Sequence, residues 1–383
     1  MNATLTYLKR YVLWNNVTNR DYKKFPSREI SCEKPFFEFK KDVSGAFYNS
    51  ELYRNIEYRY KNEVFRSSFI EFLRSTGTTS FIIIKDDTIL FEEYFNNYDR
   101  GSVNTAFSIS KSFTSALVGI AIDEGYIKSL DDKVHDYIPE LKGKVSDSLN
   151  LRHLLTMSSG IKYYTSYYPW ADEPKSYHYP DLKNLVLRHV KQEYEPGQYF
   201  KYANYNTILL GILLERSTNN SPVEYLQNKI WKPLQMEFTA GWSMDSKKTL
   251  FPKMESGINA RSIDFAKFGR LFMNLGKWDN KQIISNKWVE ESVSPLQIPD
   301  DQYYISKNFY PYSMFFKDTR LYYKYGWWGL KTSNGNYDFL AIGMLGQFIY
   351  VCPQKRIIIV RNGSKWGKIG WWPGLLRELT QKL

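Results

Sequence analysis

Phe107-Ser108-Ile109-Ser110-Lys111-Ser112-Phe113-Thr114-Ser115-Ala116-Leu117 opens the stretch that decides the fold, and its helical pattern continues to Asp123. Apolar side chains recur at the spacing of one helix face, at Ile109, Phe113, Leu117, Ile120 and Ala121. Gly125 stands where a helix commonly ends. The pattern therefore predicts a helix in which Ser108 and Lys111, three residues apart, lie on one face.

Ser108 and Lys111 have the spacing of a nucleophile and its base. A serine hydroxyl is weakly nucleophilic until a base takes its proton, and a lysine among apolar side chains can lose its charge and do so. The first turn of a helix also favours developing negative charge. A serine and a lysine exposed on a surface helix would also give the pattern Ser-x-x-Lys. The same pattern occurs from Ser31 to Lys34, in a stretch without a helical period. Support for catalysis must therefore come from the rest of the chain.

Composition excludes several classes of protein. The 383 residues carry a net charge of +12, but the lysines and arginines are scattered and match no nucleic-acid-binding module. The positive excess favours anionic small molecules or peripheral contact with an acidic membrane surface. Cys32 and Cys352 are too few for a disulfide framework or a thiolate zinc site, so we expect no metal and no cofactor. The sequence gives no indication of the oligomeric state.

Two features bear on location. No run of eighteen apolar residues predicts a membrane span. Residues 1–10 lack the charged-then-apolar layout of a signal peptide, so we expect a cytoplasmic protein unless an upstream segment has been removed.

Periodicity assigns the remaining elements. Residues 1–45 have the pattern of an irregular arm, and 53–74 that of a helix. Two strands meeting at Asp86-Asp87 predict a tight hairpin over 80–94. Short helices and turns without a convincing strand occupy 130–245, with a tyrosine- and histidine-rich loop at 176–180. Strand-like apolar runs return near the end, at 325–329, 338–343, 347–351 and 356–360, before a last helix over 374–382.

This order of elements predicts an α+β fold. Strands near both chain ends, with helices between them, favour one antiparallel sheet flanked by helices over a parallel α/β sheet. We expect residues 46–130 and 250–383 to form this sheet domain, 131–249 to form an all-helical insertion, and 1–45 to pack on the body. The cleft between sheet and insertion is the default site for a small-molecule substrate.

Other catalytic signatures are missing from the sequence. It has no Gly-x-Ser-x-Gly elbow, no Gly-x-x-x-x-Gly-Lys-Ser/Thr loop, no His-Glu-x-x-His and no Gly-x-Gly-x-x-Gly. His153 falls in a predicted helix and fits a structural role. His178 falls in the tyrosine-rich loop, from which it could contact a substrate.

Motifs in a fixed order support the catalytic interpretation. Ser-x-x-Lys, Ser-Asp-Asn and Lys-Thr-Gly form the signature of penicillin-recognising serine enzymes. The chain resembles the class C β-lactamase branch, whose middle motif is Tyr-x-Asn, through Ser108-x-x-Lys111, Tyr202-Ala203-Asn204 and blocks at 154–160 and 196–202. This resemblance covers about residues 75–365 and implies a β-lactamase/transpeptidase-like fold with serine hydrolase activity.

Within that superfamily, the C-terminal motifs narrow the resemblance. Tyr325-Gly326-Trp327-Trp328 followed by Gly343-x-x-Gly346-Gln347 is similar to 6-aminohexanoate-dimer hydrolases and related carboxylesterases. The third motif departs from the family pattern, because Met344-Leu345-Gly346 replaces Lys-Thr-Gly or His-Thr-Gly, and Lys331-Thr332-Ser333 falls in a polar turn. Loss of a cation at Met344 weakens recognition of a substrate carboxylate and suits neutral esters or amides.

The resemblance also implies roles for the site residues. Lys111, neutral through burial, takes the proton of Ser108, and Tyr202 relays it to the leaving group and later activates water. The backbone N–H groups of Ser108 and Gln347 form the oxyanion hole, and Asn204 hydrogen-bonds Lys111 and the substrate. An aromatic helix cap at Tyr202 and an N-cap at Asn204 are the structural alternatives. Strand alternation lets only one of two adjacent tryptophans face the cleft, and the further pocket candidates are Gly346, Met344, Trp327, Trp328 and His178.

Three hypotheses follow for the function. The leading one is a serine hydrolase that cleaves small amides or esters through an acyl-enzyme. The second is a β-lactamase or D-alanyl-D-alanine carboxypeptidase, which nitrocefin turnover and stable penicillin acylation would distinguish. The third is a non-catalytic member of the fold, which labelling of Ser108 by a fluorophosphonate would exclude.

Overall fold

The main sheet is built from both ends of the chain. In the computed structural model, which describes residues 2–14, 16–61, 63–295, 321–332 and 335–383, its strand order is β12-β13-β14-β15-β16-β5-β6-β2. Neighbouring strands pair antiparallel, except that β2 pairs parallel with β6. This confirms the predicted α+β class. The strands are β2 (Lys40–Lys41), β5 (Thr78–Lys85), β6 (Thr88–Tyr94), β12 (Leu321–Lys324), β13 (Trp327–Lys331), β14 (Tyr337–Gly343), β15 (Gln347–Cys352) and β16 (Ile357–Gly363).

The predicted hairpin joins β5 to β6. Asp86 and Asp87 both adopt left-handed backbone, with φ of 49° and 59°, the conformation that two-residue hairpin turns require. On its other edge β5 pairs with β16, so that Ile83 lies opposite Ile359. This pairing joins the N-terminal and C-terminal parts of the chain.

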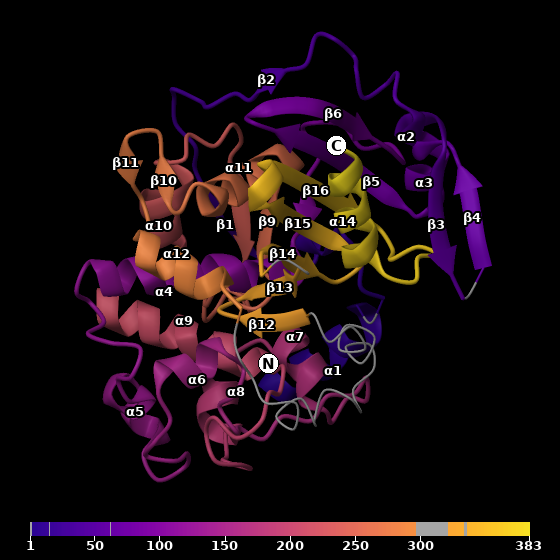
Figure 1. The fold of residues 1–383 in the computed structure, drawn as a ribbon. Coiled ribbons are helices and arrows are strands. Elements are labelled where there is room, and N and C mark those ends of the chain that lie inside the picture. Colours follow the sequence, from indigo (N-terminus) through magenta and orange to yellow (C-terminus); the bar gives the residue numbers. More distant parts are fainter. Residues whose placement is uncertain (1, 15, 62, 296–320, 333–334) are drawn as a thin grey trace.

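Helices cover both faces of the sheet. α11 (Ser262–Met273) packs against one face, and α3 (Phe69–Ser75) and α14 (Trp372–Lys382) pack against the other (Figure 1). Successive side chains of β5 point to opposite faces, so Ile82 joins the core under α11 while Ile83 joins the core under α3 and α14.

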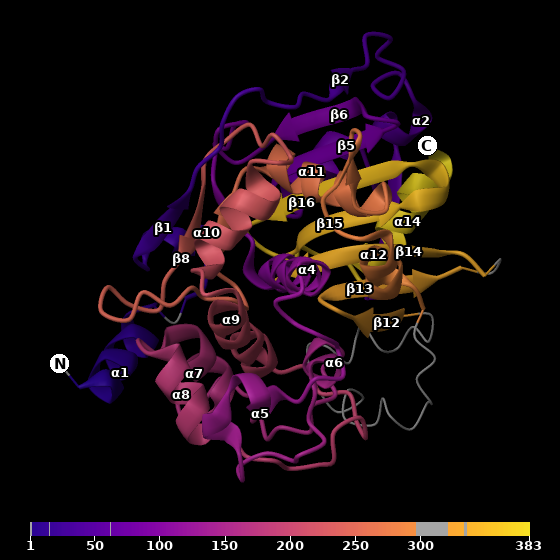
Figure 2. The same cartoon turned by 90° about the vertical axis from the view of Figure 1, so that its left-hand side faces the viewer.

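A group of helices extends from one side of the sheet (Figure 2). α4 (Ser110–Asp123) lies between the sheet and this group and packs against α9 (Asn204–Thr218), which also contacts α6 and α8. The expectation of no strand between residues 130 and 245 is wrong, because β8 (Ala240–Ser243) belongs to a small sheet with the order β1-β8-β9-β7. The other members of the helical group and the small sheet are α5 (Val134–Tyr137), α6 (Leu151–Leu155), α7 (Asp172–His178), α8 (Leu182–His189), α10 (Pro222–Leu226), β1 (Ser27–Ile30), β7 (Asn104–Thr105) and β9 (Ile258–Ala260).

Two other predictions near the N-terminus are wrong. The supposed irregular arm contains α1 (Ala3–Trp14), which is held on the body by the Tyr7 hydroxyl donating to the carbonyl oxygen of Pro169 at 2.5 Å. The supposed helix over 53–74 is the hairpin of β3 (Ile56–Tyr60) and β4 (Glu63–Ser67) followed by α3. Its phenylalanine spacing spans a strand and a helix, and the capping box at Ser68 marks where the helix begins.

Candidate active site

Ser108 and Lys111 lie together at the start of α4. Ser108 is in the short helix η2 (Phe107–Ile109), and the Lys111 amine donates to its Oγ at 3.0 Å and to the carbonyl oxygen of Glu255 at 3.0 Å. Lys111 is only 3% exposed. Burial lowers the pKa of Lys111 to about 8, although the carboxylates of Glu255 and Glu173 oppose this shift. A substantial fraction of this amine is therefore neutral near physiological pH, as a base for Ser108 must be.

The residue before Ser108 is conformationally strained. Phe107 has a φ of 49°, a left-handed conformation that costs a bulky residue roughly 1 kcal/mol or more. The backbone is held there because the N–H of Ala106 donates to the carbonyl oxygen of Ile258 at 2.8 Å. Such strain persists where surrounding structure fixes it.

Tyr202 completes a cluster with these two residues. Its phenol hydrogen-bonds the side chain of Ser108, and the Lys111 amine lies 4.9 Å from the centre of its ring. Burial raises the pKa of Tyr202 well above its usual value, which keeps the phenol protonated. The ring is packed at 6.0 Å against Trp328 and at 5.6 Å against Tyr323. The three residues predicted to be catalytic are thus brought together.

Asn204 has partners other than the one predicted. Among the described residues, its amide donates to Ser176 Oγ at 2.9 Å and to Glu173 Oε1 at 3.4 Å, and not to Lys111. Glu173 also accepts a hydrogen bond from the Tyr163 hydroxyl at 2.7 Å. Burial raises the pKa of Glu173, while hydrogen bonds and the nearby Lys111 charge oppose the rise. Glu173 is not predicted from the sequence, since no motif links a single glutamate to a lysine 62 residues away.

The oxyanion-hole prediction for Gln347 is wrong. Gln347 is 0% exposed, and its side chain donates to the carbonyl oxygens of Met344 and Gly363 at 3.0 and 2.7 Å. The predicted donor is the backbone N–H, and because the whole residue is closed off from solvent, that N–H does not reach a substrate oxygen. The backbone beside the nucleophile is that of Gly343, where an added Cβ would come within 2.2 Å of the Ala106 carbonyl oxygen. Met344, the next residue, is 40% exposed.

Gly346, the third residue of the Met344-Leu345-Gly346 motif, has a structural role in the turn between β14 and β15. Gly346 has a φ of +79°, and its carbonyl oxygen accepts from the buried Arg361 guanidinium at 2.5 Å. An added Cβ at Gly346 would come within 2.2 Å of that guanidinium. Gly346 is therefore required by the turn and not by a substrate. In the other candidate motif, Lys331 ends β13 and Ser333 lies outside the described residues.

The two tryptophans face opposite sides of β13, as strand alternation predicts. Trp328 lies on the side of Tyr202, whereas Trp327 packs at 5.7 Å against Phe268 and at 4.5 Å against Phe272 of α11. Trp327 is therefore a core residue, and its assignment to the substrate pocket is wrong.

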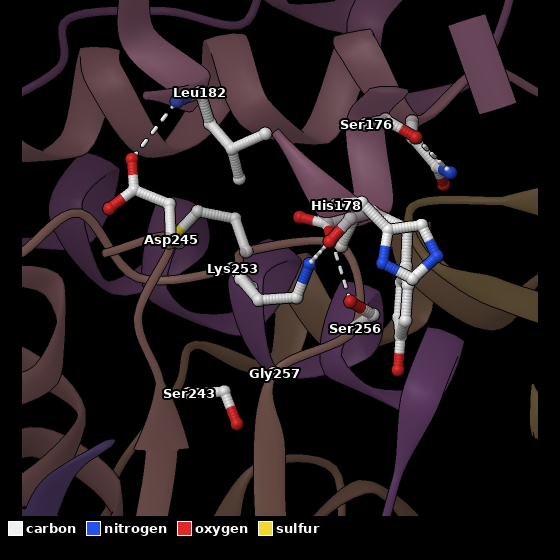
Figure 3. Close-up of polar contacts among 12 residues, drawn as sticks. Ser176, His178, Leu182, Ser243, Asp245, Lys253, Ser256 and Gly257 are labelled. Atoms are coloured by element: carbon white, nitrogen blue, oxygen red, sulfur yellow. Dashed lines mark hydrogen bonds and ion pairs between the residues drawn. The ribbon is translucent and has the colours of Figure 1, made fainter. Parts of the chain in front are cut away.

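His178 is also a structural residue. It ends α7, where a loop was predicted, and it is buried with its ring edge-on to Tyr11 and Tyr177. Burial and neighbouring positive charges, Lys253 among them, lower the pKa of His178 to about 3 (Figure 3). A neutral, enclosed imidazole of this kind is not placed to contact a substrate.

A buried ion pair lies behind Lys111. The Lys253 amine is 3.3 Å from a carboxylate oxygen of Glu255, and Ser256 Oγ donates to the same oxygen at 2.6 Å (Figure 3). Lys253 also lies over the rings of Phe25 and Tyr177, at 4.6 and 4.2 Å from their centres. Because the carbonyl of Glu255 accepts from Lys111, this cluster fixes the position of the Lys111 amine.

No metal cluster or spanning helix is found in the part of the chain that the structure describes. No three histidine, cysteine or acidic side chains there are grouped as metal ligands. None of the helices in the same residues is both long and apolar enough to cross a bilayer.

Comparison with known proteins identifies the family of this chain. Residues 68–368 match the Beta-lactamase family. The chain is 26% identical over 305 residues to 6-aminohexanoate-dimer hydrolase of Paenarthrobacter ureafaciens, covering 76% of this chain and 74% of that protein. A Bacillus anthracis protein assigned as a 6-aminohexanoate-dimer hydrolase has a similar structure, with a TM-score of 0.76, 19% identity and coverage of 97% and 92%. The D-stereospecific amidohydrolase of a Streptomyces species aligns with a TM-score of 0.56 and 20% identity, over 79% of this chain and 93% of that one. The chain belongs to the Beta-lactamase family and is a serine hydrolase of that fold.

Proposed function

We propose that the protein cleaves small amides or esters through an acyl-enzyme on Ser108. The single observation that supports this most strongly is the 3.0 Å contact between the Lys111 amine and Ser108 Oγ, made by a lysine whose pKa burial has lowered to about 8. Neutral Lys111 takes the proton of Ser108 as Oγ attacks the carbonyl carbon. Tyr202, hydrogen-bonded to Ser108, gives a proton to the leaving group and recovers one from protonated Lys111, so that both residues return to their starting states.

The oxyanion of the tetrahedral intermediate needs two donors. We assign them to the backbone N–H groups of Ser108 and Met344. Met344 replaces Gln347 in this role because it follows Gly343, whose backbone touches the segment before the nucleophile, and because it is exposed whereas Gln347 is not.

The third-motif position supports a neutral substrate. A methionine at residue 344 offers no charge to a substrate carboxylate, which disfavours penicillin-like acids. The names of two similar proteins, 6-aminohexanoate-dimer hydrolase and D-stereospecific amidohydrolase, support amides as one substrate class. Asn204 supports the site through Glu173 and not through Lys111.

Substitution of Ser108 tests this function. Ser108→Ala should abolish hydrolysis of p-nitrophenyl butyrate and labelling by a fluorophosphonate, with a free energy of unfolding within about 1 kcal/mol of wild type. Ser115→Ala is the matched control, because its hydroxyl lies on the same helix, is buried and has no hydrogen-bond partner among the described residues. Unchanged turnover in Ser108→Ala would refute the mechanism. Rapid nitrocefin turnover by wild type would show that β-lactams, and not neutral amides and esters, are the substrate class.

A further inference from the structure

We propose that Lys253 is a positioning residue for catalysis, which pairs with Glu255 and so keeps that carboxylate from becoming the counter-ion of Lys111. This inference rests on the proposed function, in which a neutral Lys111 takes the proton of Ser108. An opposite charge a few ångströms from an amine favours its protonated form. Beside an unbalanced carboxylate Lys111 would therefore stay charged, and a charged amine cannot act as the base.

The turn that carries Glu255 is bonded to the first turns of α4. The Lys111 amine donates to the Glu255 carbonyl oxygen at 3.0 Å, and Thr114 Oγ1 donates to the carbonyl oxygen of Met254 at 3.0 Å. The Glu255 carboxylate is also close enough to act on this amine. Burial lowers the pKa of Lys111, and the charge of Glu255 opposes that shift.

Lys253 holds one oxygen of the Glu255 carboxylate. Its amine lies 3.3 Å from Oε1, and Ser256 Oγ donates to the same oxygen at 2.6 Å (Figure 3). The other oxygen, Oε2, is buried and has no hydrogen-bond partner among the described residues. Lys253 and Glu255 are each 1% exposed, so solvent screens their charges little. Without Lys253, this carboxylate would be stabilised by a protonated Lys111, whose amine its own backbone already contacts.

The surroundings of Lys253 favour its charged form. The amine donates to the carbonyl oxygen of Tyr177 and lies 4.6 and 4.2 Å from the ring centres of Phe25 and Tyr177. Aromatic ring faces attract a cation in this position. Burial lowers the pKa of Lys253, but its carboxylate partner opposes that shift, and the charges of Arg10 and Asp245 act in opposite directions.

Two other titratable groups face Lys111. The charge of Glu173 on α7 also opposes the lowered pKa of Lys111, and the ring of Tyr202 lies 4.9 Å from the amine. Burial keeps the Tyr202 phenol protonated, and Glu173 accepts hydrogen bonds from neutral donors. Replacement of Lys253 leaves both groups in place, so it makes the net charge near Lys111 more negative by one.

Lys253→Met tests this role, because it removes the charge and keeps an apolar chain between the two rings. We expect kcat/KM for p-nitrophenyl butyrate at pH 7 to fall about tenfold or more, with its apparent pKa raised by about one pH unit or more above the wild-type value. The loss should shrink towards pH 10, where Lys111 loses its proton in both proteins. In the double variant Lys253→Met/Glu255→Gln the apparent pKa should return to the wild-type value or below it.

Lys267→Met is the matched control. Lys267 lies on α11, is 0% exposed and is paired with Asp264 and Glu237 at 3.6 and 3.3 Å. Its replacement therefore also removes a buried lysine from an ion pair, and we expect the apparent pKa of kcat/KM to stay at the wild-type value.

The outcomes separate this inference from the proposed function. An unchanged apparent pKa in folded Lys253→Met, or a loss of activity that is equal at every pH, would overturn the role of Lys253. A double variant whose apparent pKa is as high as that of the single variant would also overturn it, because the Glu255 charge would not be the cause. Failure of wild type to form a fluorophosphonate adduct on Ser108 would instead overturn the proposed function. If Lys253→Met does not fold, Lys253→Gln, which keeps a hydrogen-bond donor and removes the charge, replaces it with the same criteria.

Discussion

The burial of Lys111 predicts that a substitution which abolishes activity will also raise the stability of the protein. Its pKa is about 8 in the native protein against 10.5 for an ordinary lysine. At about 1.36 kcal/mol per unit, this difference of 2.5 costs the folded state roughly 3 kcal/mol at pH 7, where the amine is mostly charged. Lys111→Met removes that cost together with hydrogen bonds to Ser108 and Glu255, worth about 1 kcal/mol each. We therefore expect an inactive variant that is about 1 kcal/mol more stable than wild type at pH 7.

The pH dependence of unfolding gives a second test of the sign of the stability difference between Lys111→Met and wild type. Between pH 8 and 10.5 the unfolded chain retains the Lys111 proton and the native protein does not, so the unfolded state binds more protons and the stability of wild type rises with pH in that window. The methionine variant lacks this contribution. Its advantage over wild type should therefore shrink above pH 8 and reverse near pH 9.

Urea unfolding followed by tryptophan fluorescence at pH 7 and pH 9.5 measures the difference between the two proteins. Other groups that titrate in this range cancel in that difference. The same pKa should appear in activity, as a rise of kcat/KM with an apparent pKa near 8 in wild type. A stability difference that does not change between the two pH values would refute the reasoning, because Lys111 would then have an ordinary pKa.

Three further substitutions test the geometry of the site. Tyr202→Phe should lower kcat by about 100-fold or more in ester hydrolysis, while thermal melting stays near wild type because the ring keeps its packing on Trp328. Arg361→Met should cost at least about 3 kcal/mol in urea unfolding, because four backbone carbonyls lose a buried donor; wild-type stability would contradict this. Gly343→Ala should reduce both activity and stability through its 2.2 Å clash with a backbone carbonyl, whereas Gly101→Ala, whose nearest contact would be 3.5 Å, should change neither.

The sequence predicted an element correctly where the spacing of apolar residues within that element alone determines its structure. The β5–β6 hairpin followed from two alternating runs around Asp86-Asp87, and α4 followed from its apolar spacing. Patterns failed where tertiary contacts decide the structure. α1 is rich in β-branched and aromatic residues, which disfavour helices in isolation, and it is held by packing of Tyr7 against Tyr179 at 5.8 Å. The β3–β4 hairpin was missed because phenylalanines on two elements mimic one helical stripe.

The proposed catalytic residues also differ in how far the sequence alone predicts that they lie together. Ser108 and Lys111 share one turn of helix, so their proximity can be read from spacing alone. Tyr202 could be added only through the resemblance of its motif, since 91 residues separate it from Lys111. The supporting residue Glu173 belongs to no motif, and its place beside the lysine depends on how α7 packs against α9, where Asn204 begins the helix.

The error at Gln347 has a specific physical origin. A motif gives the order of residues along a strand but not the register of the turn that follows it. Here β14 ends at Gly343 and β15 begins at Gln347, so the three residues between them reverse the chain and carry Gln347 into the core. Arg361 fixes that reversal by donating to the carbonyl oxygens of Leu345 and Gly346. The backbone that touches the segment before Ser108 is consequently the end of β14, which is why we propose the N–H of Met344 for the oxyanion hole.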